Sequence, residues 1–341
     1  MTAFTQQRIL ATVGTSRQAL RQFRLRQQSY QHCLAEAEAR LLVHRRDHPG
    51  LGLVKAYQQI RPRGLGRDRF VREMQRRGHA LPGGPRNYTR TTRSDGYRFP
   101  NLIKGLVING LNLIWQSDTT YFRQHDRWYY LTFILDVYSR RILGYAVSPS
   151  LAATANVRAL QMALRQRKGQ DLSRLIFHSD GGTQYRYATF LTHLRRHGIS
   201  SSMCTAATDN AYAEKLNDVI KNEYLRHRPA QSPEQLRRIL QRSVQNYNHT
   251  RHHGQLPRRS SPAAYEAWLQ SRPAGTEHYA LLIRDGQANH SGKDPQPTTR
   301  PGGPNLAYPA AWATKGVSQI LPAHVILDHP TANHQLSLNL W

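Results

Sequence analysis

In the stretch Leu113-Ile114-Trp115-Gln116-Ser117-Asp118-Thr119-Thr120-Tyr121-Phe122, one carboxylate interrupts a run of side chains that favour β-structure. Branched and aromatic residues are enriched in strands, whereas aspartate is depleted there. An ionised side chain in such a strand is costly unless it is paired or bound to a metal ion. Asp118 is therefore a candidate functional residue, although a purely structural aspartate is the alternative.

Two further carboxylates lie where the expected secondary structure changes. Asp180 follows an apolar strand and precedes Gly181-Gly182, and Glu214 lies at the opening of a helix. Taken singly, each has an ordinary interpretation: a turn aspartate, and a glutamate that complements the helix dipole. The combination of all three in this order indicates a single site.

The elements around these carboxylates predict a ribonuclease H-like α/β fold, a mixed sheet with helices on both faces. The expected strands are residues 113–122, 127–136, 141–148, 175–179 and 199–203, and the expected helices are residues 153–167, 185–197 and the one that carries Glu214. Short connections make the first three strands an antiparallel meander. The first and fourth strands are neighbours in that fold, so Asp118 and Asp180 would meet at one sheet position.

The charge of the chain points to a polyanionic partner. Its 341 residues include 48 Lys and Arg against 21 Asp and Glu, which gives a formal charge of +27. A membrane surface could also attract such a chain, but no long basic helix with a bulky apolar face stands out. Nucleic acid is therefore the preferred partner.

The front of the chain reads as two basic helical pairs that precede the expected sheet. Residues 5–28 predict a helix-turn-helix whose second helix presents arginines at helical spacing; a helical hairpin with a solvated basic face is the alternative. Another helix is expected over 30–46, and a second pair over 53–60 and 67–77. Arginines spread around that last helix favour contact with phosphates over base reading. The candidate DNA-binding arginines are Arg17, Arg21, Arg24, Arg67, Arg72 and Arg76.

Turn formers and composition set the expected domain boundaries. A basic stretch around Pro82-Gly83-Gly84-Pro85 reads as a linker, and residues 285–304 are rich in Gly, Pro, Asn and His without periodicity. The expected parts are a helical DNA-binding region 1–78, a basic linker 79–110, a catalytic core 111–228, its C-terminal helical segment 229–272 and a poorly ordered tail 273–341.

Neither a zinc module nor a membrane span is expected. Cys33 and Cys204 fit no Cys/His zinc spacing and read as reduced thiols. The longest apolar run, residues 128–135, is far too short to span a bilayer, and the N-terminus lacks a lysine-led signal. We therefore expect a cytoplasmic protein.

Four motifs resemble the integrase core of transposases of the insertion-sequence 3 family. They are Trp115–Tyr121, Leu135–Arg141, His178–Tyr185 and Asp209–Glu214. Residues 48–78 resemble the helix-turn-helix-like segment ahead of that core. Tyr247–His253, followed by Ser261-Pro262-Ala263, resembles the closing segment of the family, so the resemblance covers residues 10–270.

The resemblance implies a metal-dependent DNA transposase of the DDE type. Asp118, Asp180 and Glu214 match the acidic triad that binds two divalent ions, Mg²⁺ or Mn²⁺, in that family. Such ions prefer oxygen ligands, and a pair of them can activate an attacking oxygen and stabilise a leaving one. The implied partners are transposon ends and target DNA, further copies of the chain on DNA, and a helix-turn-helix protein from an upstream frame.

One departure from the family bears on activity. Between Asp180 and Glu214 lie 33 residues, two fewer than is usual, and the loop Ser202–Asp209 lacks the usual glycine. A catalytically decayed or co-opted DNA-binding protein is therefore the main alternative. A nuclease for RNA–DNA hybrids also fits the fold, but it does not explain the basic front half.

Three neighbouring residues have open or structural interpretations. Lys221 lies seven residues after Glu214 on the same helix face and could hold DNA phosphate, with a solvated lysine as the alternative. His178 could orient a metal ligand or could simply be a packed strand histidine. Asp136 ends a buried strand before a turn, and we interpret it as structural.

Overall fold

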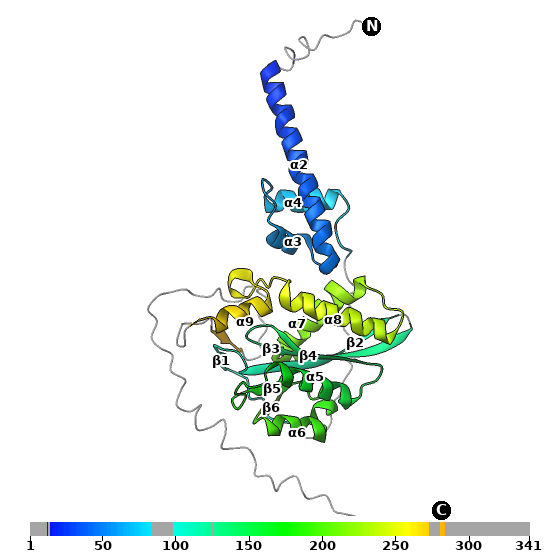
Figure 1. The fold of residues 1–341 in the computed structure, drawn as a ribbon, viewed down its shortest axis with the longest axis vertical. Helices are drawn as coiled ribbons and strands as arrows, with labels where there is room; N and C mark the ends of the chain where they lie inside the picture. Colours follow the sequence, from blue (N-terminus) through cyan, green and yellow to red (C-terminus); the bar gives the residue numbers. More distant parts are fainter. Residues whose placement is uncertain (1–11, 13, 83–97, 125, 273–279, 284–341) are drawn as a thin grey trace, which may run out of the picture. The chain divides into compact units, whose positions relative to one another are not determined.

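The computed structural model describes residues 12, 14–82, 98–124, 126–272 and 280–283. Its α/β region is built on a mixed five-stranded sheet with strand order β4-β3-β2-β5-β6 (Figure 1). The strands are β2 Ile114–Gln124, β3 Arg127–Asp136, β4 Ile142–Ser148, β5 Ile176–Ser179 and β6 Ser200–Met203. β2, β3 and β4 are antiparallel, whereas β5 pairs in parallel with both β2 and β6. The predicted ribonuclease H-like arrangement is confirmed.

The pairing of β2 with β5 brings two candidate carboxylates to one place. Ser117 of β2 lies opposite Ser179, the last residue of β5. Asp118 and Asp180 follow these two residues directly, so both emerge at the end of β5. The prediction that the first and fourth strands are neighbours is confirmed.

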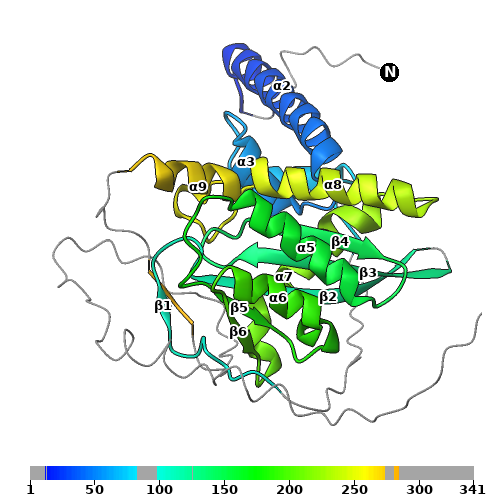
Figure 2. The same ribbon diagram turned by 60° about the horizontal axis from the view of Figure 1, so that its bottom comes forward.

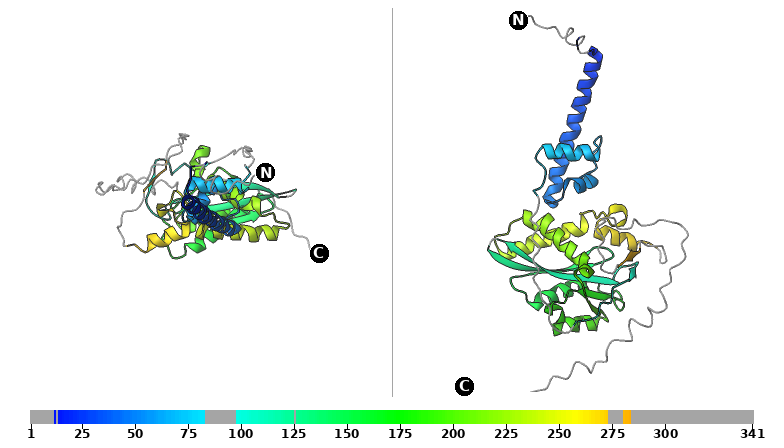
Figure 3. Two further views of the ribbon diagram at one scale, coloured as in Figure 1. Left: turned by 90° about the horizontal axis from the view of Figure 1, so that it is seen from above. Right: turned by 180° about the vertical axis from the view of Figure 1, so that it is seen from behind.

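Helices cover both faces of this sheet. α5 and α6 lie on one face and α7 and α8 on the other, as the two opposite views show (Figures 1 and 3). The helices are α5 Ala153–Gln166, α6 Ala188–Arg196, α7 Ala211–Val219, α8 Pro233–His249 and α9 Pro262–Gln270. Short helical turns are Thr183–Arg186, Ala207–Asn210, Leu225–His227 and Pro257–Arg259, and α7 continues into a π-helical turn, Ile220–Tyr224.

Each face of the sheet buries its own apolar cluster. Trp115 and Phe177 pack with α5 and α6 residues on one side, and Phe133 packs with Leu216 and Leu240 on the other. A glycine permits close packing on the first side. A Cβ at Gly144 of β4 would lie 2.0 Å from the backbone oxygen of Ala159 in α5, so a larger residue there would push the helix away.

The N-terminal helical region differs from the expected helix-turn-helix. α2 runs unbroken over Arg17–Asp47, whereas we predicted one helix ending near residue 23 and another over 30–46. No glycine or proline interrupts this span, so nothing in the backbone ends the helix there. The Ser16 side chain accepts from the Ala19 N–H and caps the helix. The first helix of the predicted motif lies outside the described residues.

The second helical pair agrees with its prediction. α3 spans Leu53–Ile60 and α4 spans Arg67–Arg76. Their apolar residues Phe70 and Met74 pack against Leu34 and Leu41 of α2. These three helices therefore share one small buried core, which leaves the arginines of α4 exposed.

A two-stranded sheet corrects the predicted boundaries of the linker and the tail. β1 Val107–Ile108 pairs antiparallel with β7 Leu281–Leu282, whereas we assigned these residues to the linker and to a poorly ordered tail. Such short strands have no local periodicity, and their pairing joins distant parts of the chain. The rest of the expected tail beyond residue 283 lies outside the described residues.

Two further predictions concern the cysteines and the absence of a membrane-spanning helix. Cys33 and Cys204 are both free thiols. Within the part of the chain that the structure describes, no helix is long and apolar enough to cross a membrane.

Candidate active site

Asp118 lies at the centre of the candidate site, in a half-buried position on β2. Its Oδ2 accepts a hydrogen bond of 2.7 Å from Nδ2 of Asn217 on α7. Burial, together with the nearby carboxylates Asp180 and Glu214, raises the pKa of Asp118 to about 7. Water is excluded and like charges are close, so the ionised form is disfavoured unless a cation joins it.

The other two predicted carboxylates belong to the same electrostatic cluster. Burial raises the pKa of Asp180, whose Oδ1 accepts from the Gly182 N–H at 3.1 Å as a turn aspartate would. Burial raises the pKa of Glu214 as well, and the charges of Asp218 and Asp180 add to the effect. The three candidates therefore repel one another, as expected for carboxylates that lack a shared counter-charge.

The three carboxylates influence one another electrostatically, but their side chains are not gathered into a metal-coordination site. Among the described residues, no group of three or more His, Cys, Asp or Glu side chains is gathered closely enough to hold one metal ion. The donor set nevertheless suits Mg²⁺ or Mn²⁺, because carboxylate oxygens with surplus negative charge are what hard divalent cations bind.

Side-chain amides fix the start of α7 on β2. Gln116 donates to the Asp209 carbonyl at 3.0 Å and accepts from the Ala213 N–H at 3.3 Å. Asn210 donates to the Ser117 carbonyl at 3.0 Å. These bonds join the residues flanking Asp118 to the residues just before Glu214. We did not predict roles for these amides or for Asn217; Gln116 and Asn210 lie inside the carboxylate motifs, and Asn217 lies one helical turn beyond Glu214.

The shortened loop before α7 is a closed turn. The Asp209 carboxylate accepts from the backbone N–H groups of Thr205 and Ala206, both at 2.9 Å, and from the Asn101 amide at 2.9 Å. These hydrogen bonds hold the pKa of Asp209 below its usual range, although burial opposes them. The loop is closed by this turn despite its shorter length. The first turn of α7 is still hydrogen-bonded to β2.

Lys221 lies near Asp118 on the helical continuation of α7. Its Nζ donates to Oγ1 of Thr120 at 2.8 Å, two residues along β2 from Asp118. Burial lowers the pKa of Lys221, and the carboxylates of Asp218 and Asp118 oppose this effect. The structure thus shows a polar contact in place of the solvated alternative, while contact with DNA stays a prediction.

His178 and Asp136 have structural roles. Nδ1 of His178 lies 2.9 Å from Oγ of Ser202, and burial lowers its pKa to about 4, so the ring is neutral. The packed strand histidine is therefore the better of the two interpretations. Asp136 accepts from the backbone N–H groups of Ser139 and Asn112 at 2.9 and 2.7 Å, which agrees with the structural interpretation.

The predicted DNA-binding arginines lie outside this cluster, on the exposed faces of α2 and α4. Two of them pair with neighbouring carboxylates: Arg67 with Asp68 at 2.8 Å, and Arg76 with Glu73 at 3.4 Å. The exposed set is Arg17, Arg21, Arg24, Arg67, Arg72 and Arg76. Their role toward DNA stays a prediction.

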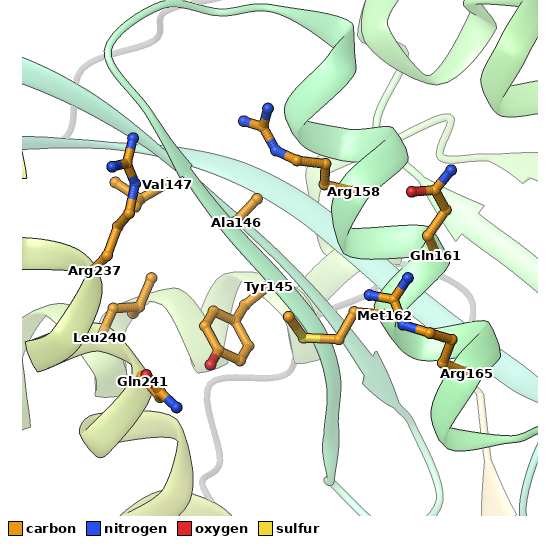
Figure 4. A pocket seen from close by; sticks show the side chains of 10 residues that line it. All are labelled: Tyr145, Ala146, Val147, Arg158, Gln161, Met162, Arg165, Arg237, Leu240 and Gln241. Atoms are coloured by element: carbon orange, nitrogen blue, oxygen red, sulfur yellow. The ribbon is translucent and has the colours of Figure 1, made fainter. Parts of the chain in front are cut away.

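A cavity of about 640 Å³ lies at the other edge of the sheet, between α5, β4 and α8. Figure 4 shows its apolar floor, formed by Tyr145, Met162 and Leu240, with arginine side chains around it. None of the predicted site residues lines this cavity. The candidate site therefore lies outside this cavity and is identified by its charges and hydrogen bonds.

Comparison with known proteins agrees with this geometry. Two family models described as "Integrase core domain" match residues 109–208 and 198–260. The transposase InsF for insertion sequence IS3A of Escherichia coli K12 is 33% identical over 45% of this chain and 53% of its own length. The chain carries an integrase core domain and is similar to transposases of the insertion-sequence 3 family.

Two further comparisons concern a curated protein and a solved structure. A Mycobacterium tuberculosis H37Ra protein, named for the transposase of insertion sequence element IS986/IS6110, is 34% identical over 48% of this chain and 62% of its own length. The chain therefore spans about three fifths or less of the curated relatives it matches. The HTLV-2 integrase catalytic core domain in complex with magnesium is 18% identical, with a TM-score of 0.37, over 48% of this chain and 98% of that one.

Proposed function

We propose that this chain is a DNA transposase of the insertion-sequence 3 family, which cuts and joins phosphodiester bonds. The observation that supports this most directly is the cluster of three like-charged carboxylates: Asp118 on β2, Asp180 directly after β5, and Glu214 on α7. Each carboxylate lies within a segment that matches an integrase core domain. Cations bound by this cluster would offset the cost of placing Asp118 in a β-strand.

Asp118, Asp180 and Glu214 would hold two divalent ions, Mg²⁺ or Mn²⁺. When bound, such ions supply activation of the attacking oxygen and stabilisation of the leaving oxygen in an in-line phosphoryl displacement. The protein contributes the arrangement of its oxygens. Asn217 fixes one oxygen of Asp118 through its amide hydrogen bond. The Gly182 N–H does the same for Asp180.

The attacking group would be water in the first step and the freed 3′ hydroxyl in the second. Water cleaves the bond at the transposon end and leaves a 3′ hydroxyl, which then attacks a phosphodiester of the target and displaces its 3′ oxygen. No side-chain nucleophile is needed. Lys221, beside the triad, would contact a DNA phosphate from its position at Thr120.

The partners proposed for this activity are DNA and further copies of the chain. The charge of +27 suits transposon ends and target DNA. Joining two ends to one target requires at least two active sites, so a homo-oligomer on DNA is proposed. A helix-turn-helix protein from an upstream frame is a further proposed partner that rests on the family resemblance.

The experiment that tests this function uses the purified chain and duplex DNA carrying the inverted repeats that flank its gene. We expect nicks with free 3′ hydroxyls, and joined products on a target plasmid, only when Mg²⁺ or Mn²⁺ is added. Salt-dependent DNA binding without metal-stimulated cleavage would favour the decayed DNA-binding protein instead. Cleavage restricted to RNA–DNA hybrids would favour a nuclease.

A further inference from the structure

The β2–β3 hairpin continues past the catalytic edge of the sheet. β5 ends at Ser179, opposite Ser117, whereas β2 runs on to Gln124. Figure 2 shows this hairpin projecting at one end of the sheet. With a strand rise of about 3.3 Å per residue, Arg123 lies roughly 16 Å along β2 from Asp118. This distance corresponds to about five nucleotide steps of duplex DNA.

The two faces of the projecting hairpin differ. On one face, Phe122 and Tyr129 are each 7% exposed and pack in the cluster that includes Leu216 of α7. The other face carries four side chains that belong to none of the buried clusters in the described residues. We call these four the hairpin patch: Tyr121, Arg123, Trp128 and Tyr130.

The rings of the hairpin patch support one another. Tyr121 lies edge-on to Trp128, with 6.4 Å between ring centroids and 88° between ring planes, and it lies 5.1 Å from Tyr130. The Arg123 guanidinium lies 5.9 Å from the centroid of Trp128. Trp128 is nonetheless 53% exposed. The patch is therefore a preformed aromatic surface with a cationic rim and no protein group covering it among the described residues.

The hairpin patch and the Asp118 carboxylate lie on opposite faces of β2, because Asp118 points to Asn217 of α7 and side chains alternate along a strand. Thr119 lies on the same face of β2 as the patch, and its Oγ1 lies 3.4 Å from the hydroxyl of Tyr185, which follows Asp180 by five residues. The row Thr119, Tyr121, Arg123 thus begins beside the Asp180 turn and ends at the hairpin tip. DNA that reached this row from Asp118 would have to pass from one face of the sheet to the other.

Charge favours DNA over a protein partner at this surface. Arg123 and Arg127 are exposed at the tip, where Asp126 offsets only one of them. Stacked aromatic rings beside arginines form the surface on which unpaired bases pack, and every base presents a π-face to it. The overall charge of +27 acts in the same direction.

We propose that the hairpin patch stacks an unpaired base of the bound DNA. This proposal rests on the proposed function, because it takes the DNA bound at the triad as the ligand. Trp128 supplies the stacking face, Tyr121 and Tyr130 hold its ring, and Arg123 lies against the neighbouring phosphate. Stacking of this kind selects distorted or gapped DNA without reading its sequence.

Binding of gapped DNA tests this proposal separately from cleavage. The full chain, in EDTA so that no cutting occurs, is titrated against a labelled duplex with a three-nucleotide single-stranded gap and against the same duplex fully paired. We expect tighter binding to the gapped duplex. Trp128→Leu should weaken that binding roughly 5- to 100-fold, whereas Trp128→Phe should retain most of it. A 2-aminopurine in the gap should be quenched by the parent and not by Trp128→Leu.

A matched arginine pair controls for charge. Arg237 of α8 pairs with Glu234 three residues away and is 54% exposed, much as Arg123 pairs with Asp126 and is 59% exposed. Arg123→Ala should weaken binding and reduce its salt dependence, while Arg237→Ala should leave the gap preference unchanged. An equal gap preference in Trp128→Leu and the parent would overturn the proposal. So would an altered oligomeric mass in Trp128→Leu with unchanged DNA binding, which would identify a protein contact.

Discussion

At the scale of single residues, Asp118 links the stability of the fold to its chemistry. The ordinary pKa of an aspartate is 3.8, and in the folded protein that of Asp118 is about 7. The folded state therefore holds this proton more tightly than the unfolded state does. The free energy of unfolding falls as the pH rises from 3.8 to about 7, and above that pH there is no further loss.

Asp118→Asn should remove this loss. In EDTA at pH 8 we expect the variant to be more stable than the parent by up to about 4 kcal/mol, while at pH 4 the two should unfold alike. Thermal denaturation at both pH values measures this. Adding Mg²⁺ at pH 8 should raise the Tm of the parent more than that of the variant. Equal Tm values in EDTA at pH 8 would contradict the buried, uncompensated charge described for Asp118.

Asn217 acts on the reaction through Asp118. Its amide fixes one carboxylate oxygen at 2.7 Å, so Asn217→Ala should weaken metal affinity roughly 10- to 100-fold, as the loss of ligand-orienting groups does. The measurement is the Mg²⁺ concentration that gives half-maximal cleavage. Asn222→Ala, an exposed amide on the continuation of the same helix, is the control. Identical Mg²⁺ dependence in both variants would refute this positioning role.

At the scale of elements, the helical continuation of α7 is held by a buried ion pair. Arg251 donates to both carboxylate oxygens of Glu223, at 2.7 and 3.0 Å, and both side chains are at most 10% exposed. Arg251→Ala would leave Glu223 buried with Lys55 as its remaining ionic partner. We expect a destabilisation of about 3–5 kcal/mol in urea unfolding. The exposed pair is the control: Arg237→Ala should cost less than about 1 kcal/mol. Equal losses of stability in Arg251→Ala and Arg237→Ala would contradict a stabilising role of the buried ion pair.

The α4 helix is the element expected to position DNA by its backbone. Arg72 and Arg76 are exposed on it. Replacing either with Ala should weaken binding to all DNA sequences alike and reduce the slope of log affinity against log salt by about 1. Titrations of specific and unrelated duplexes between 50 and 200 mM salt, a range of about fourfold, measure this. Arg195→Ala, on α6, should leave the slope unchanged; a sequence-selective loss in the α4 variants would instead indicate base reading.

Sequence patterns predicted the elements of the sheet well, because each strand and helix has its own period of apolar residues. The meander follows from those patterns, and the adjacency of β2 and β5, which brings Asp118 and Asp180 to one end of the sheet, follows from the fold that they indicate. The long α2 helix was divided wrongly, since amphipathic windows do not show where two helices merge. Contacts between distant residues, such as Asn217 with Asp118, have no local signal.

At the scale of the whole molecule, the charge excess and the acidic cluster have opposite signs. A chain of +27 attracts DNA, yet the carboxylates at the candidate site would repel its phosphates. Divalent ions at the triad would reverse that local charge. DNA bound by the basic surface would then enter the site only when metal is present.

Cleavage by carboxylate variants tests the central claim most directly. The parent and the variants Asp118→Asn, Asp180→Asn and Glu214→Gln are incubated with end DNA and Mg²⁺ or Mn²⁺. Asp171→Asn, at an exposed aspartate away from the site, serves as the control. We expect each triad variant to lose more than the roughly 100-fold that an orienting residue costs, with DNA binding retained and Asp171→Asn cutting like the parent. Metal-dependent cutting by all three triad variants at the rate of the parent would contradict the account.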